Sequence, residues 1–180
     1  VDTLFGDNNP SGRLPVTFYA ATEQLPPFED YSMTNRTYRY FNGEPLYSFG
    51  FGLSYTNFQY SNGKLSTAKL AAGDPITVSV DVRNTGDRDG DETVEVYLIP
   101  KNLVGAPLRA LVGFEKVQLP KGVCKTVQIA IDPRQLSFVS ATGARSVRQG
   151  DYEMYVGGGP PTDGGLFLPF HIEGSTPVAR

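Results

Sequence analysis

The chain has 180 residues, which is long enough to bury a hydrophobic core without disulfide bonds or metal ions. Its net charge of -3 is spread without a basic block, so we expect no nucleic-acid partner. Its lone cysteine, Cys124, excludes an internal disulfide and a Cys-x-x-Cys metal site, and no apolar run reaches the roughly 18 residues of a membrane span. We therefore expect no cofactor, no metal and no membrane insertion.

The first 19 residues predict fragments of structure that cannot close a core of their own. Residues 1–5 could form one apolar helical turn ending at Gly6. Residues 7–13 (DNNPSGR) are turn formers, and residues 14–19 (LPVTFY) predict a short strand. We expect these to be the last pieces of an α/β unit whose body lies upstream.

Residues 20–37 predict a loop, because Pro26 and Pro27 block a helix and the segment is polar. Asn35-Arg36-Thr37 matches the sequon for N-glycosylation, which has meaning only in a secreted eukaryotic protein. The motif is common by chance, so its use stays open.

Residues 38–55 (YRYFNGEPLYSFGFGLSY) are unusually rich in aromatic side chains and glycines and follow neither a strand nor a helix period. An irregular aromatic segment has to be buried between bodies or to line a pocket. Within it we interpret Phe49, Phe51 and Tyr55 as structural, packing the segment against its neighbours.

From Phe58 onward the sequence predicts an all-β domain. In residues 76–83, valine and isoleucine alternate with polar residues, as in a strand with one buried face. The same alternation predicts outward-facing Tyr97, Tyr155 and Phe167, and Pro169 suggests that the last strand is an edge. Such strands, separated by turn clusters, favour an immunoglobulin-like or fibronectin type III-like β-sandwich of about seven strands. The predicted strands are 58–65, 76–83, 94–98, 111–119, 127–131, 152–156 and 166–172.

Five stretches resemble family 3 glycoside hydrolases. Residues 6–18 (GDNNPSGRLPVTF) resemble the end of that family's second domain, an α/β sandwich, and residues 36–58 resemble the segment that leaves it. Residues 84–98, 108–122 and 147–158 resemble its appended fibronectin type III-like module. The resemblance implies two parts: 1–57, the end of the α/β sandwich domain plus the linker, and 58–180, the fibronectin type III-like domain.

The same resemblance implies that the catalytic residues lie elsewhere. Retaining glycosidases need two carboxyl groups about 5 Å apart. In this family the nucleophilic Asp lies on an N-terminal barrel and the acid/base Glu lies earlier in the α/β domain than this chain begins. No acidic residue here matches either motif, so we expect this chain alone to be inactive.

One group of residues remains as a candidate for contact with substrate. Tyr38, Arg39, Tyr40 and Phe41 combine aromatic faces, which stack on sugar rings, with a guanidinium that hydrogen-bonds hydroxyls. Packing between the α/β part and the sandwich explains the same residues, so both interpretations stay open.

Four other features have ordinary structural explanations. Asp87, Asp89 and Asp91 (DRDGD) suit a polar turn better than a calcium loop, because the distal Glu is missing. His171 has no ligand partners at metal spacing, so we expect a surface histidine. Cys124 is interpreted as a half-buried filler, and the glycine-rich residues 157–161 as a flexible loop without the Lys-Ser/Thr of a phosphate-binding loop.

The resemblance thus implies that the chain is the C-terminal portion of an exo-acting, retaining β-glucosidase or β-xylosidase acting on plant-type oligosaccharides. Its expected partners are the upstream catalytic domains of the same protein and the oligosaccharide substrate, and the family suggests a secreted or periplasmic location. The alternative is a non-catalytic carbohydrate-binding or cell-surface β-sandwich. A binding module usually shows a planar row of exposed aromatics, and the outward aromatics expected here are scattered.

Overall fold

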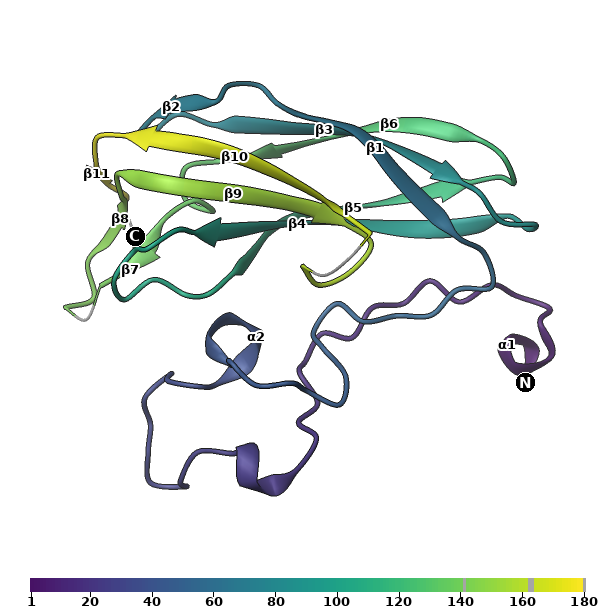
Figure 1. Cartoon of the computed structure of the whole chain (residues 1–180), viewed down its shortest axis with the longest axis horizontal. Coiled ribbons are helices and arrows are strands. Elements are labelled where there is room, and N and C mark those ends of the chain that lie inside the picture. Colours follow the sequence, from purple (N-terminus) through teal and green to yellow (C-terminus); the bar gives the residue numbers. More distant parts are fainter. Residues whose placement is uncertain (141, 162–163, 180) are drawn as a thin grey trace.

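The computed structural model describes residues 1–140, 142–161 and 164–179. Its body is a sandwich of two sheets stacked face to face (Figure 1). One sheet has the order β1-β3-β6, from β1 (Phe58–Leu65), β3 (Ile76–Asn84) and β6 (Cys124–Ile131). The other has the order β2-β10-β9-β4-β5, from β2 (Lys69–Ala71), β10 (Leu166–Glu173), β9 (Gly150–Gly157), β4 (Gly90–Pro100) and β5 (Ala110–Leu119).

The alternation of apolar residues produces this sandwich as expected. In β3, Ile76, Val78, Val80 and Val82 are buried and the residues between them are not. Their side chains pack against the inner residues of β4 and β9, such as Val96 and Met154, in one continuous core. The strand pairs are antiparallel, except that β2 runs parallel to β10.

Four short strands were not predicted from the sequence: β2, β7 (Phe138–Val139), β8 (Arg145–Val147) and β11 (Thr176–Pro177). The last three form a small sheet of order β11-β8-β7 at one end of the sandwich. Two or three residues are too few to show a period-two pattern.

Pro169 suggested that the last predicted strand is the edge of a sheet. In the structure β10 instead lies between β2 and β9. β2 pairs only with residues 171–173 of β10, so Pro169 lies outside that pairing.

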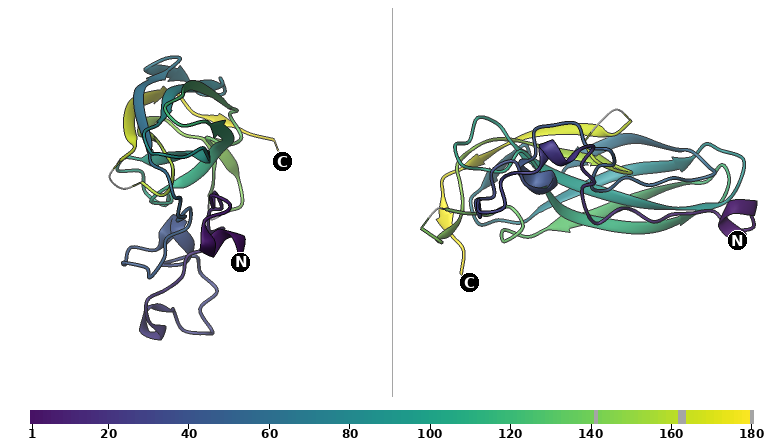
Figure 2. Two further views of the ribbon diagram at one scale, coloured as in Figure 1. Left: turned by 90° about the vertical axis from the view of Figure 1, so that its right-hand side faces the viewer. Right: turned by 90° about the horizontal axis from the view of Figure 1, so that it is seen from below.

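Residues 1–57 form an open, irregular segment beneath the five-stranded sheet (Figures 1 and 2). Its regular elements are α1 (Asp2–Phe5), η1 (Thr22–Gln24) and α2 (Thr37–Tyr40), and an isolated bridge pairs Phe18 with Tyr47. Phe41 is the only buried large hydrophobic side chain in this segment, and every residue of the segment is described. No helix in the described part of the chain has the length and apolar character needed to cross a bilayer.

The second face of the five-stranded sheet is covered, which corrects two predictions. Tyr97 and Tyr155 were expected to face outward, but they are 0% and 2% exposed. The aromatic segment lies against this face and covers Tyr97, and Tyr155 packs on both Tyr97 and Phe167. Phe167 is half-exposed as expected, so the sandwich presents no planar aromatic row of these three residues.

Cys124 also differs from the expectation. It begins β6, as predicted, but its side chain is exposed rather than half-buried. The first three residues of β6 are all exposed, and the alternating burial of this strand starts only at Val127.

Candidate functional site

A buried ion pair joins the segment of residues 1–57 to the sandwich. The Arg13 guanidinium lies 2.7 Å from the Glu92 carboxylate near the start of β4, and its Nε–H donates to the carbonyl oxygen of Gly158 at 2.7 Å. The other Glu92 oxygen accepts a 2.6 Å hydrogen bond from the hydroxyl of Tyr60 on β1. One carboxylate therefore connects the N-terminal segment, both sheets and the loop after β9.

Burial controls the electrostatics of this network. Desolvation raises the pKa of Glu92, while the Tyr60 hydrogen bond and the Arg13 charge oppose the rise. Desolvation together with the Glu92 charge raises the pKa of Tyr60 far above its usual range, so Tyr60 stays a hydrogen-bond donor. The Glu92 carboxylate is thus fully engaged by structural partners.

A second buried carboxylate lies nearby on the covered face of β4. Glu95 accepts a 2.7 Å hydrogen bond from the hydroxyl of Tyr97, and desolvation raises the pKa of Glu95. Gly50 of the aromatic segment lies directly against this pair, because a Cβ there would sit 2.5 Å from the carboxylate and 2.6 Å from the hydroxyl. Gly50 also has a φ of 81°, so only glycine suits this contact.

The glycine-rich loop after β9, which the sequence analysis interpreted only as a flexible loop, has a packing role. A Cβ on Gly158 would lie 2.0 Å from the Glu92 carboxylate. The loop therefore closes over the buried ion pair, and a glycine at position 158 is needed for that close approach.

The aromatic segment packs through Tyr38, Phe49 and Phe41. The rings of Tyr38 and Phe49 stack at a centroid distance of 4.0 Å, and both meet the edge or face of Tyr97. The Tyr38 hydroxyl accepts a 3.0 Å hydrogen bond from the backbone N–H of Leu111 on β5. Phe41 is 4% exposed and packs edge-to-face on Tyr19. Tyr38 and Phe41 are thus held in packing contacts.

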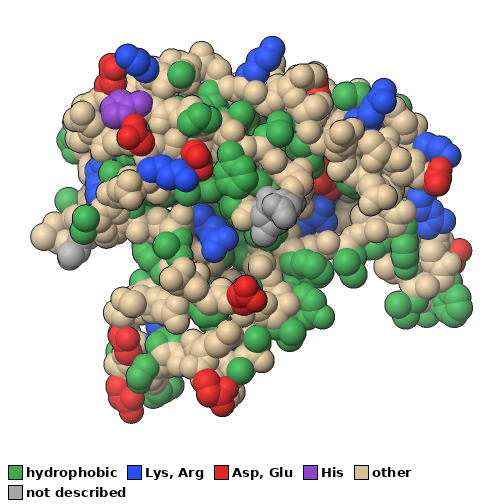
Figure 3. Space-filling model, in the orientation of Figure 1, with side chains coloured by type: hydrophobic (Ala, Val, Ile, Leu, Met, Phe, Trp, Pro, Cys, Tyr) green, Lys and Arg blue, Asp and Glu red, His purple; other side chains and the backbone are tan. Residues whose placement is uncertain are grey.

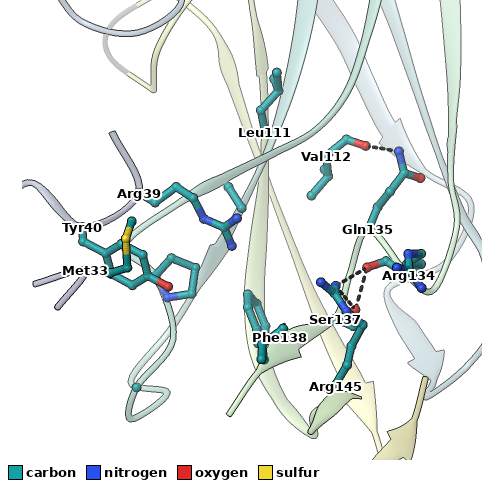
Figure 4. A pocket seen from close by; sticks show the side chains of 14 residues that line it. Met33, Arg39, Tyr40, Leu111, Val112, Arg134, Gln135, Ser137, Phe138 and Arg145 are labelled. Carbon is teal, nitrogen blue, oxygen red and sulfur yellow. Dashed lines mark hydrogen bonds between the residues drawn. The ribbon is translucent and has the colours of Figure 1, made fainter. Parts of the chain in front are cut away.

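The other two substrate-rim candidates, Arg39 and Tyr40, line a cavity between α2 and the sandwich (Figure 4). Of the two remaining structural candidates, Phe51 packs on Tyr47 at 5.2 Å. Tyr55 is half-exposed, and its hydroxyl donates to the Thr3 carbonyl while Arg88 lies over its ring. The structure brings Tyr38 and Phe49 together but leaves Tyr55 apart, near α1. A substrate-rim role for the four residues 38–41 stays a prediction.

The remaining polar candidates are each engaged locally. Asp87 pairs with the Lys121 side chain, Asp89 accepts from the Lys121 backbone, and Asp91 pairs with Lys116. Asp87 and Asp89 thus bind Lys121 from the turn that joins β3 to β4, whereas Asp91 lies on β4 and pairs across to β5. His171 is partly exposed as expected, and its Nδ1 lies 2.6 Å from Asp151, a partner that the sequence analysis missed.

The segment of residues 1–57 carries most of the exposed apolar surface. Thirteen of the nineteen exposed large hydrophobic side chains in the described chain belong to residues 1–55. Figure 3 shows green side chains below the middle of the molecule and at its lower right, around α1, with fewer on the projecting lower-left part. We call this surface, formed by the exposed apolar side chains of residues 1–55, the apolar face. Stable proteins rarely leave so many large apolar side chains exposed on one short segment. The face comprises Val1, Leu4, Phe5, Val16, Phe18, Leu25, Phe28, Tyr31, Met33, Leu46, Tyr47, Leu53 and Tyr55.

Comparison with known proteins divides the chain into two matching regions. Residues 1–55 match the Glycosyl hydrolase family 3 C-terminal domain, and residues 92–159 match the Fibronectin type III-like domain. A xylan 1,4-beta-xylosidase of Xylanibacter ruminicola is 41% identical over 157 residues, which are 87% of this chain and 18% of that protein. A periplasmic beta-glucosidase of Salmonella typhimurium is 38% identical over 170 residues, which cover 87% of this chain and 22% of that protein.

Solved structures of other proteins contain the same fold over nearly the whole length of this chain. Beta-glucosidase 3B from Thermotoga neapolitana, in complex with alpha-D-glucose, superposes with a TM-score of 0.84 and 32% identity over 99% of this chain and 27% of that chain. A beta-glucosidase from Kluyveromyces marxianus in complex with glucose gives a TM-score of 0.81 and 32% identity, over 98% of this chain and 23% of that one. The chain spans about a fifth of the length of the two curated relatives described above.

Proposed function

Because this chain belongs to the C-terminal region of the family 3 glycoside hydrolases, we propose that it is the non-catalytic C-terminal part of an exo-acting, retaining β-glucosidase or β-xylosidase. We use the word parent for that longer polypeptide. The observation that carries the proposal is the apolar face, which belongs to a segment with one buried large hydrophobic residue and no core of its own. In this proposal the segment is the C-terminal end of the α/β domain of the parent.

The partner of the apolar face is, in this proposal, the upstream catalytic part of the parent. The sandwich contributes rigidity, because Arg13, Tyr38 and Phe49 fix the segment to its five-stranded sheet. Because the segment is held in this way, its exposed apolar side chains keep a fixed position relative to the sandwich. The module thereby stabilises the catalytic part without contributing to the chemistry.

The 180-residue chain alone has no hydrolytic activity in this proposal. Glycoside hydrolysis with retention of configuration requires two carboxyl groups, a nucleophile and an acid/base, that flank the scissile bond. The buried carboxylates of Glu92 and Glu95 are instead bound to Arg13, Tyr60 and Tyr97 within the fold.

The test combines activity with association. The purified chain should release no nitrophenol from aryl β-glucosides or β-xylosides, and when it is co-expressed with the separated upstream part it should bind that part and raise its thermal stability. Turnover by the chain itself, or an upstream part that is equally stable without it, would contradict the proposal.

We further infer that the parent cleaves terminal glucose or xylose from plant-type oligosaccharides outside the cytoplasm. The support is that relatives carry the names xylan 1,4-beta-xylosidase and periplasmic beta-glucosidase. Kinetics of the parent on xylobiose and cellobiose, with cell fractionation of the source organism, test substrate and location separately.

A further inference from the structure

A cavity of about 400 Å³ lies between α2 and the sandwich. One wall comes from α2 and the preceding loop, with Arg39, Tyr40 and Met33, and another from β5, with Leu111 and Val112 (Figure 4). The loop after β6, together with β7 and β8, supplies a third wall, including Arg134, Ser137 and Arg145, and the loop between β4 and β5 adds Gly105 and Pro107. In Figure 4, the Arg39 side chain extends into the space that separates Tyr40 and Met33 from Gln135 and Ser137.

The charges around this cavity are unbalanced. Arg39, Arg134 and Arg145 line it, and none of the lining residues is an aspartate or a glutamate. Among the described residues, none of these three arginines forms an ion pair with a carboxylate. Three positive charges in one concave site favour an anion.

Arg39 is the least satisfied of the three arginines. Its Nε–H is buried and has no hydrogen-bond partner in the described structure. In contrast, Arg134 donates to the Ala179 carbonyl at 2.8 Å, and Arg145 donates to the Ser137 hydroxyl at 2.9 Å. A buried donor without a partner costs about 1–3 kcal/mol, so it calls for an explanation, and a bound acceptor supplies one.

The shape and lining of the cavity indicate which kind of ligand bears the anionic group. A planar guanidinium fork matches a carboxylate, which it can bind through two parallel hydrogen bonds. The cavity is larger than a carboxylate needs, since small-molecule pockets begin near ~300 Å³. The ring of Tyr40 and the side chains of Leu111 and Phe138 provide apolar surface for the body of a ligand.

We propose that this cavity binds a sugar that carries a carboxylate, a hexuronate, with the carboxylate at Arg39 and Arg145 and the sugar ring beside Tyr40. That the ligand is an anion follows from the three arginines, because none of them pairs with a carboxylate among the described residues; the carboxylate is chosen together with the sugar. The choice of a sugar as the body of the ligand rests on the proposed function, since a plant-type polysaccharide offers uronate groups beside its neutral sugars. Binding is measured on the 180-residue chain, which is inactive in the proposed function, so it is followed without turnover.

The test is a titration of the 180-residue chain followed through its arginine Nε–H signals by NMR. Sodium glucuronate should shift the Arg39 Nε–H signal in a saturable way, whereas glucose, the neutral analogue, should not. Sodium acetate should bind more weakly than glucuronate, because it has no ring to contact Tyr40. Absence of a glucuronate shift, an equal response to glucose, or equal binding of acetate would each overturn the proposal.

Two variants and a matched control locate the site. Arg39→Gln and Arg145→Gln should each weaken glucuronate binding about ten- to hundredfold, the usual effect of losing a charged hydrogen bond. Arg83→Gln, which removes the same charge from an exposed position on β3, should leave binding unchanged. Because the Arg39 guanidinium donates to no group in the described structure, Arg39→Gln should keep the melting temperature of the chain, which separates lost binding from lost folding.

The parent provides the final arm of the test. Binding of glucuronate by both the chain and the parent supports a ligand site. Binding by the chain but not by the parent would overturn the sugar assignment, because an upstream aspartate or glutamate would then fill the cavity. Either result leaves the glycosidase proposal intact, since that proposal is tested by activity and by association with the upstream part.

Discussion

The Arg13 guanidinium and the Glu92 carboxylate form an ion pair 2.7 Å long, and the side chains are only 11% and 3% exposed. The two residues are 79 positions apart in the sequence, on opposite sides of the boundary between the irregular segment and the sandwich. The pair therefore connects the stability of the sandwich with the attachment of the segment.

Removing one partner of this pair should be costly. Arg13→Met leaves the Glu92 charge buried without its cationic partner, and breaking a buried pair in this way typically costs about 3–5 kcal/mol. Urea unfolding of the chain measures the loss. Lys121→Met, which breaks the exposed pair with Asp87, is the control and should change the midpoint very little. Equal effects of the two variants would contradict a central role for Arg13.

The pH dependence of stability tests the Glu92 environment. Burial raises the pKa of Glu92 in the folded protein. The native state then holds its proton more tightly than the unfolded chain, so this group's contribution to stability falls as pH rises from the ordinary glutamate pKa of about 4.3 up to the raised value. Thermal melts across this range should show a shallower fall for Glu92→Gln than for the wild type. Glu115→Gln, an exposed change on β5, should keep the wild-type slope.

The loop after β9 allows a test by adding a single methyl group. Gly158→Ala places a Cβ 2.0 Å from the Glu92 carboxylate, and overpacking of this kind costs about 1–3 kcal/mol. Gly12→Ala is the matched control, because nothing lies within 4 Å of its Cβ position. Calorimetry should show a lower melting temperature for Gly158→Ala only. A neutral Gly158→Ala would mean that the loop is not pressed against the ion pair.

The sequence predicted the sandwich well because its signal is local. Alternation in residues 76–83 is visible without any partner strand, and the structure buries Ile76, Val78, Val80 and Val82 accordingly. Local alternation could not show that a second body covers the outer face of β4. Tyr97 was therefore assigned to solvent, whereas Phe49 and Tyr38 bury it.

The buried network was missed for a related reason. Arg13 stands in a turn-forming run and Glu92 in an acidic one, so each looks like an ordinary surface charge. The contact between them depends on how the segment crosses the sheet, which no spacing within the sequence encodes. The one available signal was the run of glycines after β9, since consecutive glycines next to a strand indicate close approach of another group.

The four substrate-rim candidates can be separated in the parent. Phe41 is buried against Tyr19, so Phe41→Ala should lower stability by up to ~3–5 kcal/mol and leave the Michaelis constant unchanged. Tyr40 is only half-buried, so Tyr40→Ala should raise the Michaelis constant for an aryl glycoside with little loss of stability. Kinetics and thermal melts of both variants provide the two readouts. An unchanged Michaelis constant for Tyr40→Ala would remove it from the substrate rim.

The apolar face gives the last prediction, in which the same substitution should act differently in two contexts. Leu53 is 69% exposed in the chain, so Leu53→Ser removes little buried surface there and should change stability by less than about 0.5 kcal/mol. In the parent the upstream part would cover Leu53, and losing a buried leucine side chain costs roughly 1.5–3 kcal/mol. Val104, in the loop after β4, is 90% exposed and lies outside the apolar face.

Val104→Ser is therefore the control, and we expect it to be neutral in both proteins. Melting temperatures of the two variants in the chain and in the parent give four values, of which only Leu53→Ser in the parent should be lowered. If Leu53→Ser is neutral there as well, the face is not covered by the upstream part at this position. If Val104→Ser is the variant that destabilises the parent, the upstream part contacts the sandwich through its β4–β5 loop rather than through residues 1–55.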